Sequence, residues 1–194
     1  MPIFAAPINP SLTSPVHPRG MTQYRRLRLP GATYFFTVCL DDSASTVLTD
    51  HIGALRFAYA KTMAERPVRC HAMVVLPNHL HAVWTLPEGN CDFSERWRLI
   101  KARFSRAVGL EADRCASKIA KRERGLWQRR FWEHAVRDEA ELAALIGYCH
   151  LNPVEHGLVT RPGDWPYSSF TKRKDGQIAH PTPGTGVSAR LAMH

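Results

Sequence analysis

Four strand-like segments and two helix-like segments alternate between residues 33 and 136. Aromatic, β-branched and alternating apolar residues predict the strands, at 33–40, 68–76, 79–86 and 131–136. Apolar residues at helical spacing predict the helices, the first begun by Asp50 and the second covering Asp92 to Val108. The order strand, helix, strand, strand, helix, strand is that of a ferredoxin-like fold, an α+β domain with an antiparallel sheet.

An additional helix follows this pattern. Asp138-Glu139-Ala140-Glu141 fits a capping box, as Asp92-Phe93-Ser94-Glu95 does for the preceding helix. The apolar spacing continues to about His150, and Asn152-Pro153 is expected to end the helix. The sequence therefore predicts a C-terminal helix beyond the sheet, and this helix carries Tyr148.

The length of 194 residues is sufficient for one domain with a substantial core. We predict that this domain covers residues 21–170, after a disordered proline-rich extension (1–20) and before a flexible tail (171–194). No run of about 18 apolar residues is present, so no membrane span is expected. Five scattered cysteines without a CxxC pair indicate reduced thiols, as in cytoplasmic proteins.

Positive charge is concentrated in one window of the chain. Residues 96–130 hold twelve Lys and Arg against three Asp and Glu, whereas the remainder holds fourteen of each. A solvated helix face is one explanation of such a run, and a polyanionic partner is the other. The second interpretation makes Arg98 and Lys101 candidate DNA contacts.

His79 and His81 are separated by one residue in a predicted strand, so both imidazoles lie on one face of it. Two such side chains can share a divalent cation, although a His-x-His pair also occurs in strands by chance. A third ligand with an oxygen or amide donor would suit Mg²⁺ or Mn²⁺.

Tyr148 and Asn152 are four residues apart and share one face of the last helix. That face could present a nucleophile and an amide ligand to the same cation. Asn152 could instead be only a helix terminator, and Tyr148 an ordinary half-buried tyrosine. If all four residues meet, a cation on a phosphate would assist attack by the phenol and yield a covalent phosphotyrosine.

The run Trp127-Gln128-Arg129-Arg130-Phe131-Trp132 mixes aromatic and basic residues. Aromatic rings can stack on unpaired bases while arginines hold phosphates. We expect one aromatic of the run to be buried and Arg129 and Arg130 to be available, with Trp127 as the candidate stacking residue. Arg25 and Arg26 near the N-terminus could add backbone contacts.

The chain resembles the REP-associated tyrosine transposases, a group of single-strand nucleases of the HUH class within the IS200-like superfamily. The resemblance covers about residues 24–170. It rests on five separated blocks: Tyr24-Arg25-Arg26, Val74-Val75-Leu76-Pro77-Asn78-His79-Leu80-His81, Trp127-Gln128-Arg129-Arg130-Phe131-Trp132-Glu133-His134, Tyr148 to Val154, and Asp164-Trp165-Pro166-Tyr167-Ser168-Ser169.

This resemblance implies specific roles. His79 and His81 match the metal-binding histidines, Tyr148 matches the nucleophile, and Asn152 stands where related insertion-sequence transposases often have a Gln ligand. The implied reaction is cleavage and rejoining of single-stranded DNA beside palindromic-repeat hairpins, with Mg²⁺ or Mn²⁺. The implied protein is a monomer or homodimer in the cytoplasm, associated with the nucleoid.

Two other functions remain open from the sequence. A domesticated hairpin-binding protein without nuclease activity would keep the basic window without using Tyr148. A metal-dependent phosphohydrolase of small molecules would need neither the basic window nor the tyrosine. The stretch 110–126 resembles an insertion, and no role is predicted for it.

Overall fold

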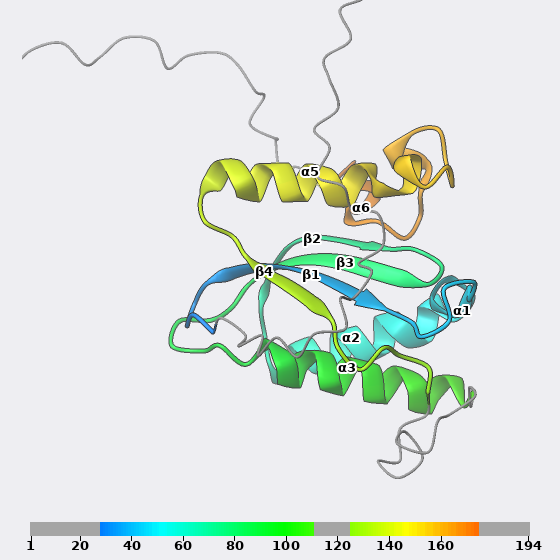
Figure 1. Ribbon diagram of the computed structural model, residues 1–194, viewed down its shortest axis with the longest axis horizontal. Coiled ribbons are helices and arrows are strands. Elements are labelled where there is room, and N and C mark those ends of the chain that lie inside the picture. The colour runs from blue at the N-terminus through cyan, green and yellow to red at the C-terminus, as the bar shows by residue number, and fades with distance from the viewer. Residues whose placement is uncertain (1–27, 111–124, 175–194) are drawn as a thin grey trace, which may run out of the picture.

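The computed structural model describes residues 28–110 and 125–174. A four-stranded antiparallel sheet lies between two helical layers, with α2 and α3 on one face and α5 on the other (Figure 1). The strands are β1 (Thr33–Cys39), β2 (Arg69–Val75), β3 (His79–Thr85) and β4 (Trp132–Ala135). The helices are α1 (Val47–Asp50), α2 (Ile52–Glu65), α3 (Phe93–Val108), α5 (Glu139–Glu155), the 3₁₀ turn η1 (Pro162–Asp164) and α6 (Ser169–Lys174).

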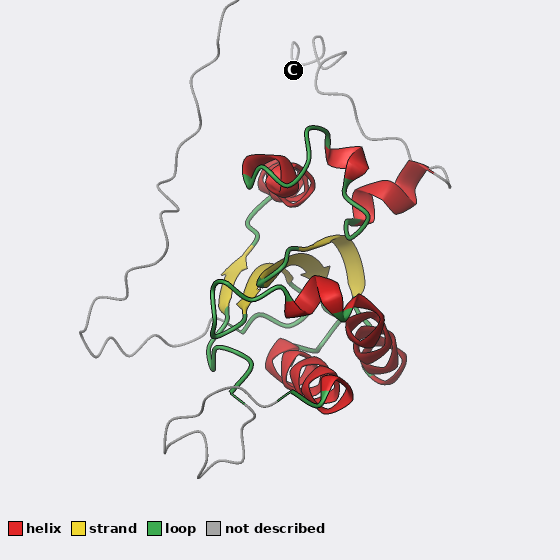
Figure 2. Cartoon of the chain, turned by 90° about the vertical axis from the view of Figure 1, so that its right-hand side faces the viewer, coloured by secondary structure: helices red, strands yellow, loops and turns green. Residues whose placement is uncertain are grey.

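The strand order in the sheet is β2-β3-β1-β4, and every neighbouring pair is antiparallel. This is the ferredoxin-like arrangement, and α5 is the additional helix beyond it. The predicted α+β fold class is therefore confirmed. The side view shows the helices above and below the sheet (Figure 2).

Alternation along the strands separates two apolar cores. The larger core lies between the sheet and α2 and α3, and its largest side chains are aromatic: Tyr34, Phe36, Trp84, Trp97 and Phe104. The smaller core lies under α5 and includes Phe35, Val74, Val83 and Cys149. Burial of each large apolar side chain stabilises the fold by about 2–3 kcal/mol before entropy is counted. The smaller core holds α5 on the face that carries His79 and His81.

The predicted N-caps of α3 and α5 are confirmed. The Asp92 carboxylate accepts a hydrogen bond from the Glu95 N–H at 3.2 Å, and Asp138 accepts one from Glu141 N–H at 2.8 Å. The prediction that Asp50 begins a helix was wrong. Asp50 ends the short α1, and α2 starts after His51, because Thr46 and Ser45 open an additional turn of helix upstream.

The prediction that Asn152-Pro153 ends the last helix was also wrong. Helix α5 continues to Glu155 with Pro153 inside it, and the His156 N–H still bonds to the Asn152 carbonyl at 3.0 Å. Proline removes one backbone donor near the end of the helix, where packing on the sheet outweighs that loss. Asn152 is thereby held in helical geometry one turn after Tyr148.

Residues 165–169, which we call the edge segment, follow α5 and η1 and lie along the free edge of β2. The Val75 N–H donates to the Tyr167 carbonyl at 2.9 Å, and the Trp165 indole N–H donates to the Val75 carbonyl at 2.9 Å. The Ser169 hydroxyl accepts from the Met73 N–H at 3.0 Å. This segment covers half of an edge strand whose backbone groups would otherwise be exposed. It also ties the end of α5 to the sheet of the same chain.

Several sequence predictions fall outside the described residues: Arg25 and Arg26, the extension 1–20, most of the stretch 110–126 and the tail from 175 onward. Among the residues described, no helix is both long and apolar enough to cross a bilayer. The four cysteines in that part of the chain are free thiols.

Candidate active site

His79 and His81 project from β3 toward α5, as the alternation predicts. Their ring centroids lie 5.0 Å apart. His81 is 4% exposed, and His79 is partly buried. Leu80 and Ala82 point to the opposite core. The pair therefore stands on the sheet face that α5 covers.

Each histidine is oriented by a hydrogen bond at Nδ1. Nδ1 of His79 lies 2.6 Å from the Asn78 side-chain oxygen, and Nδ1 of His81 lies 2.9 Å from the Thr37 hydroxyl. With Nδ1 protonated in both rings, each Nε2 lone pair is available to a cation. Sequence reasoning missed Thr37, because only the pairing of β1 with β3 places it opposite His81.

Burial keeps both imidazoles neutral. Desolvation, followed by the charge of nearby His156, lowers the pKa of His79 to about 4. Desolvation first, then His79 and His156, lowers the pKa of His81 to about 3, against a backbone hydrogen bond with Phe36. Neutral imidazole is the form that binds metal, so at pH 7 neither histidine has to lose a proton first.

Tyr148 reaches the histidines from α5. Its ring centroid lies 5.3 Å from that of His81 and 5.8 Å from that of Phe35, and Phe35 itself stacks on His81 at 5.3 Å. Desolvation raises the pKa of Tyr148, a hydrogen bond with Asn152 partly offsets this, and nearby Glu155 and Cys149 add to the rise. The phenol is therefore protonated at neutral pH and would require activation to act as a nucleophile.

Asn152 is 1% exposed, one helical turn after Tyr148. Among the described residues, no hydrogen-bond donor reaches its side-chain oxygen. A buried carbonyl oxygen without a partner costs about 1–3 kcal/mol, so it is expected to have a ligand. The interpretation of Asn152 as a simple helix terminator is not supported, because the residue lies within the helix.

The donors at this site fit a hard divalent cation. Two neutral imidazoles and one amide oxygen leave further positions for water and a phosphate oxygen, as Mg²⁺ and Mn²⁺ require. In residues 28–110 and 125–174, no three His, Cys, Asp or Glu side chains form a metal-binding group. A third ligand to such a cation would have to be of another type, and the buried, unpartnered oxygen of Asn152 is a donor of that type. All of these residues belong to one chain.

Exposed His156 extends the site beyond His79. It follows the last residue of α5, and its ring centroid lies 5.2 Å from that of His79. A cavity of about 230 Å³ opens beside both rings, lined also by Ser43, Thr46 and Asn78. His134 and His150 have structural contacts instead: His134 with Glu141 at 3.0 Å, and His150 with Ser169 at 3.4 Å.

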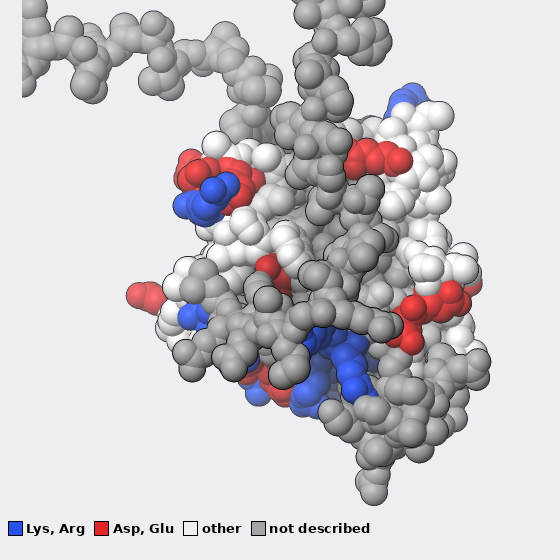
Figure 3. All heavy atoms as spheres, viewed as in Figure 1, with Lys and Arg blue, Asp and Glu red and all other residues white. Residues whose placement is uncertain are grey.

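Helix α3 is less available to a polyanion than its charge indicates. Arg96 is buried and donates to the Arg66, Pro67 and Asp92 carbonyls, so its role is structural. Arg98 pairs with Glu95 at 2.6 Å but is exposed, and Lys101 donates to the Gln128 carbonyl at 2.8 Å. Lys and Arg side chains still gather over this helix on one face of the molecule (Figure 3).

The structure assigns the aromatic residues of 127–132 differently from the sequence prediction. Trp127 is only 8% exposed, packs against Phe104 and donates its indole N–H to Ser105 at 3.1 Å. Its ring is not open to a base, so the stacking role predicted for Trp127 has no support. Trp132 is 51% exposed instead. Arg129 and Arg130 are exposed in the bend before β4, as expected.

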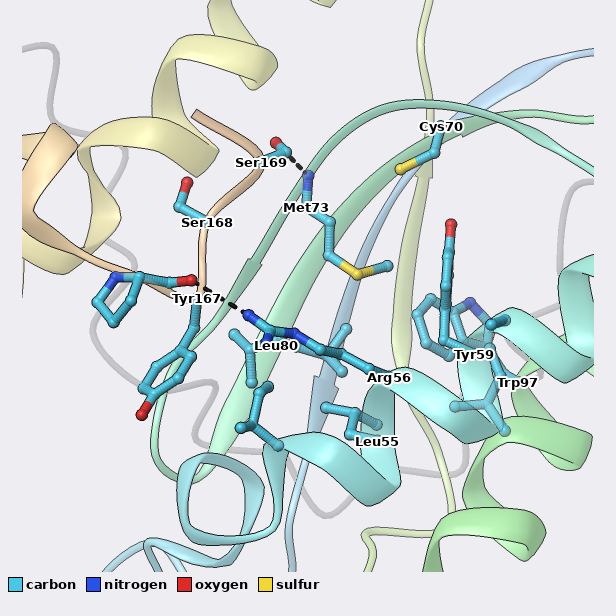
Figure 4. Close-up of a pocket in the computed structure, with 15 residues that line it drawn as sticks. Leu55, Arg56, Tyr59, Cys70, Met73, Leu80, Trp97, Tyr167, Ser168 and Ser169 are labelled. Carbon is cyan, nitrogen blue, oxygen red and sulfur yellow. Dashed lines mark hydrogen bonds between the residues drawn. The ribbon is translucent and has the colours of Figure 1, made fainter. Parts of the chain in front are cut away.

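A second cavity, of about 410 Å³, lies on the other side of the sheet (Figure 4). Side chains of α2 and α3 line it together with the edge segment, among them Leu55, Tyr59, Trp97 and Tyr167. None of the candidate catalytic residues borders it. This mostly apolar cavity lies between the helices and residues 166–169, and the candidate catalytic residues lie on the opposite face of the sheet.

The low pKa values of the two histidines predict a loss of stability in acid. In the unfolded chain both histidines bind a proton below about pH 6.5. In the folded chain His79 stays neutral down to about pH 4 and His81 down to about pH 3. Stability is therefore complete above pH 6.5 and is lost as the pH falls toward these values. We expect urea unfolding in EDTA to show a decrease of about 2 kcal/mol from each histidine of the pair between pH 7 and 4.5.

His81→Gln should remove part of that decrease, and His51→Gln, at an exposed histidine, should leave it unchanged. The same dependence on pH in all three proteins would show that the buried pair is not responsible.

Comparison with known protein-family models gives no match. Individual relatives are nevertheless clear. An Escherichia coli K12 protein, the REP-associated tyrosine transposase, is 44% identical over 150 residues, which cover 77% of this chain and 83% of the relative. The chain belongs to the REP-associated tyrosine transposase family. The family predicted from the sequence blocks is thus confirmed.

Two further comparisons agree. A Haemophilus influenzae protein provisionally assigned to the REP-associated tyrosine transposases is 40% identical over 159 residues, covering 81% of this chain and 90% of the relative. A solved REP-associated tyrosine transposase, bound to a REP hairpin, is 38% identical with a TM-score of 0.71. That match covers 87% of this chain and all of the solved chain, so the transposase fold extends across the described domain.

Proposed function

We propose that this transposase cleaves and rejoins single-stranded DNA beside a palindromic-repeat hairpin through a 5′-phosphotyrosine. The observation that carries the proposal is the contact between the Tyr148 ring and His81, which lies beside His79 on the same strand face. Asn152, one helical turn after Tyr148, hydrogen-bonds with it and carries a buried side-chain oxygen without a partner. Family membership supports the same assignment, and the solved relative was bound to a hairpin of this kind.

Tyr148 acts as the nucleophile in this proposal. Its phenolic oxygen forms a bond to phosphorus while the bond from phosphorus to O3′ breaks. The phenol loses its proton and the departing O3′ gains one, which leaves a 5′-phosphotyrosine and a 3′-hydroxyl. One phosphoester bond replaces another, so attack by a 3′-hydroxyl can rejoin a strand without a nucleotide cofactor.

His79, His81 and Asn152 would hold Mg²⁺ or Mn²⁺, which would neutralise phosphate charge and stabilise the transition state when bound. The side chains around them do the rest. Thr37 and Asn78 fix the histidine rings, and Phe35 holds the Tyr148 ring against His81. The hydrogen bond from Asn152 favours the phenolate that attacks.

The test is adduct formation on a denaturing gel. Purified protein is mixed with a labelled DNA hairpin that carries a single-stranded flank from palindromic repeats of the source genome. With Mn²⁺ we expect a denaturant-resistant protein–DNA band and a free 3′-hydroxyl fragment, and with EDTA neither.

A fully paired duplex of the same sequence is the control and should give no adduct. Tight hairpin binding without any adduct would instead favour the non-catalytic hairpin-binding function. Hydrolysis of a generic phosphodiester without an adduct would favour the phosphohydrolase.

A further inference from the structure

Trp132 is an exposed aromatic ring beside the candidate active site, and the proposed chemistry does not use it. It is the first residue of β4, at the edge of the sheet, and 51% of it is exposed. Helix α5 makes its main contacts with β2 and β3, whereas Trp132 stands at the β4 edge of the sheet with half of its surface exposed. A large indole exposed on a rigid strand is a typical platform for an unpaired base.

The strand register places Trp132 in line with the histidines. Thr37 of β1 pairs with His81 on one side and with Trp132 on the other. Directly paired residues share a face of the sheet, so all three side chains point toward the α5 side. Two strand spacings separate His81 from Trp132, about 10 Å. Stacked DNA rises about 3.4 Å per nucleotide, so this distance corresponds to about three nucleotides or fewer.

Neighbouring side chains fix the orientation of the indole. The Trp132 ring is parallel to that of His134, with an interplanar angle of 5° and centroids 5.8 Å apart, and its edge meets Phe35 at 5.7 Å. His134 is held by Glu141 of α5, and Phe35 also contacts Tyr148. The indole is therefore held in a fixed position relative to α5, which carries the proposed nucleophile. Binding of a base would cost little further side-chain entropy at Trp132.

The bend before β4 adds charge beside the ring. Trp127 and Gln128 pair with the end of β1, whereas β4 pairs with its middle, so residues 129–131 bend away between the two pairings. Arg129 and Arg130 are exposed in this bend. Base stacking on an aromatic ring next to arginines is the pattern of single-strand binding surfaces.

We infer that Trp132 stacks on one unpaired base of the DNA flank and thereby positions the strand, within about three nucleotides of the phosphate that Tyr148 attacks. This inference rests on the proposed function. Trp132 is a positioning residue, since it lies outside the group of side chains that would touch the reacting atoms.

A double-mutant cycle, which combines a Trp132 variant with DNA that lacks one base, tests the inference. Full-length protein is titrated, in EDTA and at constant salt, with the labelled hairpin carrying either an intact flank or one abasic nucleotide at each flank position in turn. For the wild type we expect one position at which loss of the base weakens binding about 5- to 100-fold, the value of one base–aromatic stack. Trp132→Ala should weaken binding of the intact hairpin by a similar factor. Its affinity should then fall no further when the base at that position is removed.

Two variants provide the controls. Trp132→Tyr keeps an aromatic face and should retain most of the affinity and the sensitivity to the abasic position. Phe57→Ala removes an aromatic residue that is 65% exposed on α2 and should behave as the wild type.

The inference fails if Trp132→Ala binds intact DNA normally, or if it keeps the full abasic penalty at every position. Failure of the wild type to bind any hairpin would contradict the proposed function as well. If the wild type forms the adduct but no abasic position weakens its binding in a way that depends on Trp132, only the inference is contradicted.

Discussion

Tyr148→Phe is expected to abolish the covalent protein–DNA adduct and to slow cleavage by at least about a thousand-fold. Phenylalanine keeps the ring packed between Phe35 and His81 but lacks the oxygen that would bond to phosphorus. The fold should survive, because the change removes one hydroxyl and one hydrogen bond, worth about 1 kcal/mol. Cleavage rates on denaturing gels and a thermal unfolding curve measure the two effects.

Tyr167→Phe is the matched control, because Tyr167 is a partly buried tyrosine that borders the cavity on the other face of the sheet. It should form the adduct at the wild-type rate. An adduct that persists in Tyr148→Phe would mean that another side chain is the nucleophile. Hairpin binding by Tyr148→Phe should be unchanged, so lost activity can be separated from lost binding.

His81→Gln is expected to remove Mn²⁺ binding and to lower cleavage by at least about a hundred-fold, since loss of a supporting residue alone typically costs a metal site ten- to a hundred-fold. His81 is the more deeply buried of the pair and contacts the Tyr148 ring. Calorimetric titration of Mn²⁺ into the metal-free protein gives the affinity without reference to activity. His71→Gln, at a partly buried histidine of β2, should bind Mn²⁺ as the wild type does.

The same titration tests the role of Asn152. Asn152→Ala should weaken Mn²⁺ binding, whereas Asn152→Asp keeps an oxygen donor and should retain or strengthen it. If both variants bind Mn²⁺ as the wild type does, the orphaned oxygen of Asn152 is not a ligand. The family assignment would stand in that case, because it rests on similarity along the chain.

The fold was largely predictable because its signals are local. Period-two alternation along 79–86 sorts Leu80 and Trp84 from His79 and His81, and the structure preserves that division between the two cores. Aspartates at 92 and 138 cap their helices as predicted, since a cap needs only residues within one turn. The end of α5 was not predictable from Pro153 alone, because packing on the sheet extends the helix beyond the proline.

Charge and aromatic content were less informative about the DNA-binding surface. Arg96 and Arg98 are two residues apart on the same helix, yet one is buried among backbone carbonyls and the other is exposed. Trp127 and Trp132 lie in one run, yet the first ring is buried and the second is half exposed. Burial depends on partners distant in sequence, such as Phe104 for Trp127, and no local pattern specifies them.

The sequence by itself determined the order of elements, the shared face of His79 and His81, the helical spacing of Tyr148 and Asn152, and the family. These follow from local periodicity and from residue blocks in a defined order. The tertiary structure alone decided that the two pairs meet, that Asn152 has a buried oxygen without a partner, and that Trp132 stands exposed in line with His81. The physical reason is that these relations arise from strand register and from the packing of α5 on the sheet, which join residues far apart in the chain.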